Sequence, residues 1–190
     1  KPKISKLKLD LRGLFYIPRI VKASKKGDAA ILKVLIKILS ENKIKVIKLN
    51  TFNPELTLKK GIYTKTKPTL LEKEEIYMGI KALKKINSYD HTQAVIIRDN
   101  KVISRETRKG TKEMIKSIPK SKIKKGILIK LPKAKQDLRV DLPTIGIDTF
   151  KDCNRVGIKG IVVKSNQNII LNKEVSIKYA NQNKLFLIAL

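Results

Sequence analysis

The chain has 190 residues, enough to bury one large hydrophobic core or two small ones without disulfides or a structural metal. Hydrophobic residues make up 42% and charged residues 32%, which excludes a disordered chain, and the aromatic share of 5% argues against a surface built to stack on nucleic-acid bases. Lys and Arg number 44 against 16 Asp and Glu, a formal net charge of +28.

The positive charge is consistent with three interpretations: a nucleic-acid partner, an anionic membrane surface, or a lysine-rich residue bias without a specific partner. Lysines occur in every segment from Lys1 to Lys184 and far outnumber arginines, which favours the residue bias. The charge would still attract the protein to anionic lipid headgroups. We therefore expect contact with a membrane surface and no nucleic-acid partner. A basic nucleic-acid-binding module without catalytic activity is the alternative.

The chain has one cysteine, Cys153, and one histidine, His91. These single residues exclude a disulfide framework and a zinc site with the usual ligand spacing, and we expect no Cys–His or Ser–His nucleophile pair. No apolar run approaches the roughly 20 residues that cross a bilayer. We therefore expect a cytoplasmic protein, with a peripheral place at the inner membrane as the alternative. The chain begins at Lys1 with neither Met nor a signal-peptide pattern, so we expect its natural N-terminus upstream.

The N-terminal part is predicted to alternate helix and strand. A helix is predicted to begin at Gly27–Asp28, because the apolar residues that follow recur at helical spacing, and 44–49 is predicted to be a strand. Thr69 and Glu72 form the T-x-x-E pattern of a capping box, which predicts a second helix that ends near residue 86. The inward-facing residues of this second helix are expected to be Leu71, Ile76, Ile80 and Leu83.

The C-terminal part is predicted to combine strands and helices in a mixed α/β arrangement. Residues 93–104 contain two strand patterns joined at Asp99 and Asn100, which is typical of a hairpin. The continuous apolar run 126–131 indicates a strand that is buried on both faces. The other predicted elements are a helix at 112–118 capped by Thr111, a helix from Thr149 to Val156, a strand at 161–163, a helix after Asn172 and a strand at 185–189.

The run QDLRVDLPTIG at 136–146 gathers acidic residues in a chain that has few of them. An extended conformation places Asp137, Arg139 and Asp141 on one face and three apolar side chains on the other. A straight strand separates Cα atoms four residues apart by about 13 Å, whereas two carboxylates that share one Mg²⁺ need oxygens about 3 Å apart. The two aspartates therefore either have divided roles or lie on a strand that bends. An exposed edge strand with a charge stripe is an equally supported interpretation.

Two turns, each followed by a predicted helix, have residues that are typical of a phosphate-binding turn. The first, 143–146, ends in Gly146, which permits close backbone approach, and Thr149 is expected to cap a helix whose first N–H groups favour an anion. The second is 106–111, although an ordinary helix cap is the simpler interpretation there. The chain contains neither G-x-x-x-x-G-K-[ST] nor G-x-G-x-x-G, so the residues carry no P-loop and no dinucleotide fingerprint.

Segments from about Asp10 to Leu190 carry a family pattern. They are DLRGL near Asp10, the GDAA helix start, QAVIIRDNKVIS, ETRKGT, KLPKAKQDLRVDLPTIGIDT, VGIKGIVV and KLFLIAL. Together they resemble the LpxI-type UDP-2,3-diacylglucosamine pyrophosphatases of lipid A synthesis, and QDLRVDLPTIG is the most specific segment. The resemblance implies hydrolysis of the pyrophosphate bond of UDP-2,3-diacylglucosamine to UMP and 2,3-diacylglucosamine 1-phosphate (lipid X), assisted by Mg²⁺ or another divalent cation.

The resemblance also implies which residues act and how the chain is divided. Asp137 and Asp141 match the acidic pair and are the expected catalytic residues and metal ligands. The expected substrate-binding residues are Gln93, Glu106, Gly110, Thr111, Lys130, Lys133 and Arg139, to which the turn at 143–146 and the helix that follows it add Thr144, Gly146 and Thr149. Residues 1–86 are expected to be the remainder of a partial Rossmann-like nucleotide-binding domain with a connecting helix, and 87–190 a mixed α/β catalytic domain.

Overall fold

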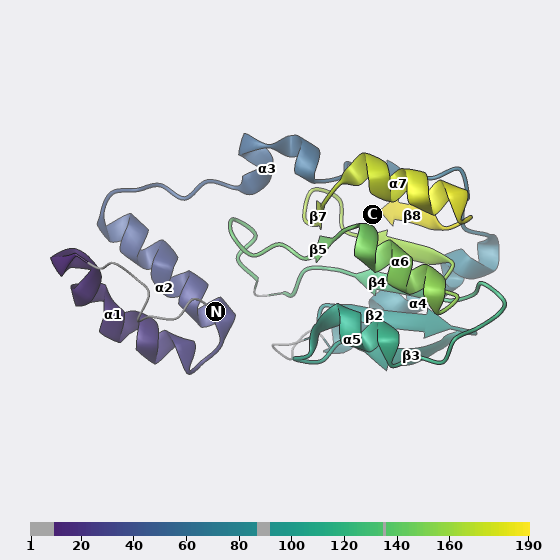
Figure 1. The fold of residues 1–190 in the computed structure, drawn as a ribbon, viewed down its shortest axis with the longest axis horizontal. Helices are drawn as coiled ribbons and strands as arrows, with labels where there is room; N and C mark the ends of the chain where they lie inside the picture. The colour runs from purple at the N-terminus through teal and green to yellow at the C-terminus, as the bar shows by residue number, and fades with distance from the viewer. Residues whose placement is uncertain (1–9, 87–91, 135) are drawn as a thin grey trace.

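A mixed sheet of six strands forms the centre of the described chain (Figure 1). The structure is a computed structural model that describes residues 10–86, 92–134 and 136–190. In the order in which they pair, the strands are β1 (Gly61–Ile62), β8 (Phe186–Ala189), β6 (Gly160–Val163), β4 (Ile127–Lys130), β2 (Ala94–Arg98) and β3 (Lys101–Arg105). β4, β6 and β8 are parallel, whereas β1 and the β2–β3 hairpin join them in antiparallel pairing. A separate parallel pair consists of β5 (Thr144–Ile145) and β7 (Ile169–Ile170).

The central strands are buried along their whole length because helices cover both faces of the sheet, and their residues are apolar except for Lys130 at the end of β4. α5 (Gly110–Lys116), α6 (Ile147–Arg155) and α7 (Lys173–Gln182) lie in front of the sheet in Figure 1, and α4 (Leu70–Ile86) lies behind it. Successive strand residues point to opposite faces, so Leu128 packs in the core under α5 and α6 while Ile129 packs under α4. The core of the protein is therefore two apolar layers with β4 between them.

α4 approaches the sheet closely at Gly79. A Cβ atom at this position would lie 2.3 Å from Cδ1 of Ile129, which is well inside van der Waals contact. The glycine therefore lowers the helix propensity of α4 but allows it to sit directly on β4.

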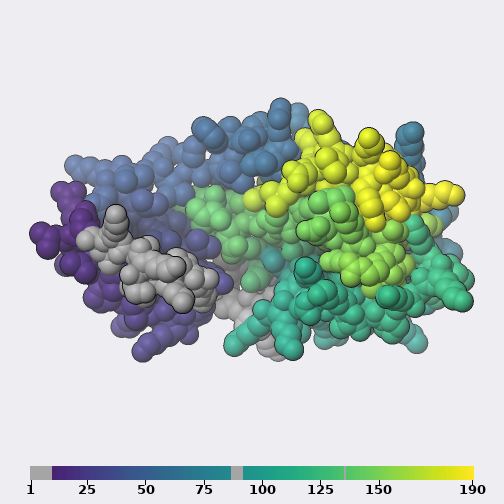
Figure 2. Space-filling model, in the orientation of Figure 1, coloured from purple at the N-terminus to yellow at the C-terminus, as the bar shows by residue number. Residues whose placement is uncertain are grey.

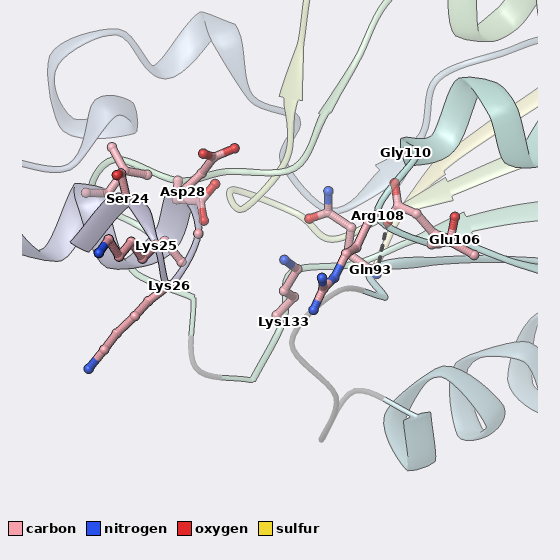
Figure 3. A pocket seen from close by; sticks show the side chains of 14 residues that line it. Ser24, Lys25, Lys26, Asp28, Gln93, Glu106, Arg108, Gly110 and Lys133 are labelled. Atoms are coloured by element: carbon pink, nitrogen blue, oxygen red, sulfur yellow. Dashed lines mark hydrogen bonds between the residues drawn. The ribbon is translucent and has the colours of Figure 1, made fainter. Parts of the chain in front are cut away.

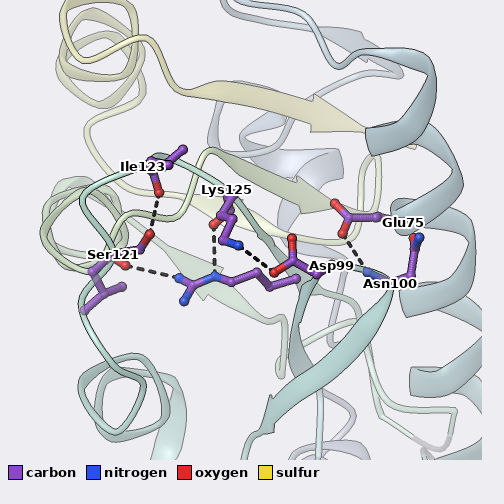
Figure 4. Close-up of polar contacts among 8 residues, drawn as sticks. Glu75, Asp99, Asn100, Ser121, Ile123 and Lys125 are labelled. Carbon is purple, nitrogen blue, oxygen red and sulfur yellow. Dashed lines mark hydrogen bonds and ion pairs between the residues drawn. The ribbon is translucent and has the colours of Figure 1, made fainter.

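The turn of the β2–β3 hairpin is fixed by polar contacts to its neighbours (Figure 4). Asp99 and Asn100 both have positive φ, 51° and 59°, as a two-residue hairpin turn of this kind requires. Asp99 accepts a hydrogen bond of 2.6 Å from Lys125 Nζ, and the Asn100 N–H donates to Glu75 on α4 at 3.0 Å. These charges therefore stabilise the end of the sheet at which β4 begins.

Two helices at the N-terminal end pack on each other at one end of the molecule, with the sheet and its helices at the other (Figure 2). They are α1 (Leu11–Ser24) and α2 (Asp28–Glu41). Arg19 on α1 holds both carboxylate oxygens of Glu41 on α2, at 2.6 and 2.8 Å, and Asn42 donates to the Tyr16 hydroxyl at 2.9 Å. Two short helical segments follow, α3 (Leu49–Phe52) and η2 (Pro54–Leu56). None of the helices in the described ranges is long and apolar enough to span a membrane.

The structure confirms the helix predicted from Gly27–Asp28, which is α2, and shows that a further helix, α1, precedes it. The strand predicted at 44–49 is wrong: residues 44–48 have no regular structure and Leu49 begins α3. A strand is stabilised by hydrogen bonds to a neighbour, and no strand among the described residues pairs with this segment. A Rossmann-like arrangement of the N-terminal part therefore stays a prediction.

The capping box before α4 is confirmed. The Thr69 N–H donates to Glu72 Oε2 at 2.7 Å, and the Glu72 N–H donates in return to Thr69 Oγ1 at 3.3 Å. Three of the four expected inward residues are buried or partly buried, but Leu71 is 72% exposed because it lies in the first turn, beyond the edge of the core. The domain boundary expected at residue 87 lies outside the described residues.

The C-terminal predictions are largely confirmed. The hairpin, the buried strand β4 and the strands β6 and β8 occur where the patterns place them, and the predicted mixed α/β class is correct. Two helix starts differ from the prediction. α5 begins at Gly110, so Thr111 lies inside it, and α6 begins at Ile147, so Thr149 lies in its first turn and accepts a 3.4 Å hydrogen bond from the Gly146 N–H.

Candidate functional site

An open pocket of about 590 Å³ lies beyond the carboxyl end of β4, between the α1–α2 loop and the segments that follow β3 and β4 (Figure 3). Ligands in open α/β sheets usually bind at this end of the strands. The residues that line the pocket are Ser24, Lys25, Lys26, Gly27, Asp28, Ala29, Leu32, Gln93, Glu106, Thr107, Arg108, Gly110, Lys133 and Asp141.

Glu106 is the most constrained of the pocket side chains. It follows β3, is 5% exposed, and its backbone N–H donates to the Ala94 carbonyl at 2.9 Å, which extends the hairpin by one residue. Its Oε2 accepts a hydrogen bond of 3.0 Å from the Gln93 N–H, and its Oε1 accepts one of 2.5 Å from the Thr111 hydroxyl. The carboxylate is therefore held in a single orientation at the wall of the pocket.

Lys130, the last residue of β4, lies directly behind this wall and is 6% exposed. Its Nζ donates hydrogen bonds to Thr111 Oγ1 at 2.8 Å and to the Thr144 carbonyl at 3.0 Å. Burial lowers the pKa of the Lys130 ammonium, and the neighbouring Glu106 carboxylate opposes that shift. The expected substrate-binding residues Glu106, Thr111, Lys130 and Thr144 thus form one connected network.

The QDLRVDL segment is a turn in the structure and not the extended strand that its alternation predicts. The Asp137 carboxylate accepts the Arg139 backbone N–H at 3.1 Å, and the Asp137 carbonyl accepts the Asp141 N–H at 2.9 Å. An aspartate that binds the backbone two residues ahead competes with strand pairing, which explains why the prediction is wrong. The segment therefore bends. The separation that a straight strand would impose on the carboxylates of Asp137 and Asp141 does not apply to it.

The side chain of Asp137 is occupied by Arg139. Arg139 donates from Nε to Oδ1 at 3.0 Å and from Nη2 to Oδ2 at 2.8 Å. This bidentate pair is the largest cause of the lowered pKa of the Asp137 carboxyl. Asp141, by contrast, lines the pocket. The two aspartates consequently have different surroundings.

The predicted site residues fall into three groups. Gln93, Glu106, Gly110, Lys133 and Asp141 line the pocket itself. Thr111, Lys130 and Thr144 lie behind it and are connected to Glu106 through hydrogen bonds. Four others are not among its lining residues in the described part of the chain: Asp137, Arg139, Gly146 and Thr149.

Sequence reasoning missed the wall formed by the α1–α2 loop and missed Arg108. Figure 3 shows Gln93, Arg108 and Lys133 on one side of the pocket, and Ser24, Lys25 and Asp28 on the other. The sequence signal for this turn is Gly27, which follows two lysines. In the structure Gly27 has a φ of 103°, a value that favours glycine. That signal does not say which distant residues the turn will face.

The charge pattern of the pocket suits an anion that brings a cation with it. Lys25, Lys26, Arg108 and Lys133 supply positive charge from both walls, whereas Asp28, Glu106 and Asp141 supply carboxylates. Guanidinium and ammonium groups are the usual protein partners of phosphate oxygens.

The donor chemistry of the pocket also suits Mg²⁺. Among the residues that the structure describes, no group of three or more His, Cys, Asp and Glu side chains could hold a metal ion without other ligands. Mg²⁺ is commonly bound by one or two carboxylates together with substrate phosphates and water. Asp141 offers such a carboxylate, and Gln93 Oε1 is a buried oxygen that has no hydrogen-bond partner among the described residues. The metal ligands expected from the sequence, Asp137 and Asp141, stay a prediction.

Comparison with known proteins places these features in a family. A family model described as the LpxI C-terminal domain matches residues 59–188, a region that contains the whole sheet except Ala189 and the pocket wall from Gln93 to Asp141. UDP-2,3-diacylglucosamine pyrophosphatase LpxI of Caulobacter vibrioides is 28% identical over 196 aligned residues, which cover 99% of this chain and 70% of that protein. Because the family match spans most of the chain and includes the pocket wall, the chain belongs to the LpxI family.

Proposed function

We propose that the protein hydrolyses the pyrophosphate bond of UDP-2,3-diacylglucosamine to UMP and 2,3-diacylglucosamine 1-phosphate, as a step of lipid A biosynthesis. The observation that supports this proposal is the pocket in which Arg108 and Lys133 lie on the same wall as Glu106, and whose lining also includes Asp141. The name of the Caulobacter relative supports the choice of substrate. A diphosphate carries the negative charge that these cations would bind.

Two cations of the pocket, Arg108 and Lys133, extend from the wall next to the sheet and would hold the diphosphate there. Lys25 and Lys26 belong to the α1–α2 loop opposite, and their ammonium groups point away from that wall (Figure 3). The backbone around Lys133 is fixed, because its N–H donates to Gln136 Oε1 at 2.9 Å. Charge that develops on the phosphate oxygens during bond cleavage would be stabilised by these preorganised groups.

Asp141 is the carboxylate that we assign to the chemistry. It lines the pocket and is held by the turn that begins at Asp137, so it can orient a water molecule toward a phosphorus atom. A bound Mg²⁺, with Asp141 among its ligands, would neutralise diphosphate charge. Arg139 and Asp137 would act by stabilising the turn.

The substrate class also supports a place at the inner membrane surface on its cytoplasmic side. A diacylated sugar nucleotide keeps its acyl chains in a lipid surface while its diphosphate is in water. The net charge of +28 would attract the protein to anionic headgroups, at about 1 kcal/mol for each well-placed Lys or Arg.

The proposal is tested by measuring UMP release from UDP-2,3-diacylglucosamine in detergent micelles, with Mg²⁺ and with a chelator. We expect metal-dependent release by the wild type and a raised KM in Arg108→Gln. Lys125→Met is the matched control, because Lys125 pairs with Asp99 at the opposite end of β4. Absence of UMP release with any divalent cation would overturn the proposal. The nucleic-acid alternative instead predicts duplex binding that weakens steeply as salt is added.

A further inference from the structure

Lys130, the last residue of β4, lies behind the pocket wall and is bonded to two segments that contribute lining residues. Its backbone is fixed, since its carbonyl accepts a 3.1 Å hydrogen bond from Asn168, a residue that is 1% exposed. Asn168 is itself held by the Lys164 N–H, which donates to its side-chain oxygen at 2.8 Å. The ammonium group therefore projects from an anchored strand end.

One arm of the Lys130 network leads to Glu106. The Thr111 hydroxyl accepts a hydrogen bond from Lys130 Nζ and donates its own proton to Glu106 Oε1. Glu106 Oε2 then binds the Gln93 N–H, so that the chain of bonds reaches two residues of the pocket lining. A hydroxyl between an ammonium and a carboxylate uses its donor and one acceptor position, and an apolar side chain cannot replace it.

The other arm leads to the segment that carries Asp141. Lys130 Nζ donates to the carbonyl of Thr144, the first residue of β5, three positions after Asp141. β5 is also held from its far side, where it pairs with β7. The same ammonium group is thus bonded to the support of Glu106 and to the support of Asp141.

We propose that Lys130 is a positioning residue, which acts through Thr111 and the Thr144 carbonyl to keep Glu106 and Asp141 facing the same pocket. It is 6% exposed and does not belong to the pocket lining of the described chain, so it acts on the substrate only through these neighbours. Its charge and that of Glu106 offset each other in the buried wall, and removal of either leaves the other uncompensated. The inference rests on the hydrolytic function proposed above.

The test compares Lys130→Met and Thr111→Val with the wild type, and Lys125→Met serves as the control for loss of one lysine. Two properties are measured in each: the kinetics of UMP release, and the hydrogen exchange of the Gln93 amide, which reports the Glu106 contact without need of activity. We expect Lys130→Met to lower kcat about 100-fold and to change KM less than about threefold, because only transition-state alignment is lost. Exchange of the Gln93 amide should accelerate in Lys130→Met and in Thr111→Val.

The double variant Lys130→Met with Thr111→Val separates one network from two independent effects. If both residues act through Glu106, kcat of the double variant should equal that of Lys130→Met. A wild-type kcat in Lys130→Met would overturn the inference. A raised KM at unchanged kcat would also overturn it, because that result indicates that Lys130 binds the substrate phosphate directly. Should Lys130→Met fail to fold, Thr111→Val alone decides by the same criteria.

The two proposals fail in different ways. A wild-type protein that releases no UMP contradicts the hydrolytic function, and the amide exchange of Gln93 then still decides whether Lys130 couples the walls. An active wild type with unaltered Gln93 exchange in both variants contradicts the positioning role alone.

Discussion

Arg139 binds both carboxylate oxygens of Asp137, a residue only two positions before it in the chain. The pair closes the turn that leads to Asp141, and it keeps Asp137 in its ionised form by lowering the pKa of that carboxyl. Two aspartates four residues apart in one motif thus have separate surroundings, one in the turn and one at the pocket.

We expect unequal effects when the two aspartates are changed. Asp141→Asn should lower kcat for UMP release about 100-fold, and Asp137→Asn less than about tenfold, because only Asp141 faces the pocket. Steady-state kinetics of both variants check this. A greater loss in Asp137→Asn than in Asp141→Asn would contradict the division of roles.

Glu72 caps α4 and forms a 2.7 Å ion pair with Lys159. Glu72→Gln should destabilise the protein by about 1–3 kcal/mol at pH 7, from the lost pair and the weakened cap. Urea unfolding measures the difference. Glu74→Gln, an exposed position on the same helix, should cost less than about 0.5 kcal/mol.

The same substitution should have a pH dependence. Burial raises the pKa of Glu72, but hydrogen bonds from Lys159 and Thr69 outweigh it, so the pKa lies below its ordinary value of 4.5. A lowered carboxylate pKa contributes stability that is complete above the ordinary pKa and is lost as the pH falls through the folded-state value. The stability difference between wild type and Glu72→Gln should therefore shrink below pH 4.5. A difference that grows on acidification would contradict this assignment.

Gly79→Ala should destabilise the protein, although alanine favours helix formation by about 1 kcal/mol over glycine. The added Cβ would lie 2.3 Å from Ile129 Cδ1, and overpacking of this kind costs about 1–3 kcal/mol. Ile129→Val removes the clashing Cδ1 atom. Thermal unfolding of the double variant should therefore show less destabilisation than the sum of the two single changes, and strict additivity would contradict the contact.

Cys153 should be inert in the folded protein. It is fully buried in α6, and burial together with the neighbouring Asp152 raises the pKa of its thiol far above the ordinary value, so little thiolate is present at neutral pH. A thiol reagent should react with it only as fast as the protein unfolds, at a rate that rises with denaturant. Rapid labelling of the native protein at pH 8 would contradict this expectation.

Much of the fold follows from local patterns in the sequence. The apolar run of β4, the Asp99–Asn100 turn and the Thr69–Glu72 capping box each depend on residues close together in the chain, and all three are found. The segment 44–49 has a strand pattern too, but a strand also needs a partner, and none is present among the described residues. Local sequence patterns therefore predict turns and helix caps well, whereas a strand pattern predicts a strand only where a neighbouring strand is available to pair with it.

The site was harder to predict than the fold. Alternating residues favour an extended QDLRVDL segment, yet the bonds that Asp137 makes with Arg139 outweigh the alternation and form a turn. The wall with Lys25 and Asp28 precedes the facing wall by more than 60 positions, and no periodicity in the sequence relates the two. Only the tertiary arrangement brings them to one pocket.

The ion pair between Arg19 and Glu41 makes the shape of the binding region depend on residues outside it. It fixes α1 against α2, and the connection between these helices carries Ser24 and Lys25 to the pocket. The α1–α2 loop is therefore held in one conformation at the pocket by the packing of the two helices. Sequence drift in the packing of the two helices can consequently retune ligand preference while every residue that touches the ligand is retained.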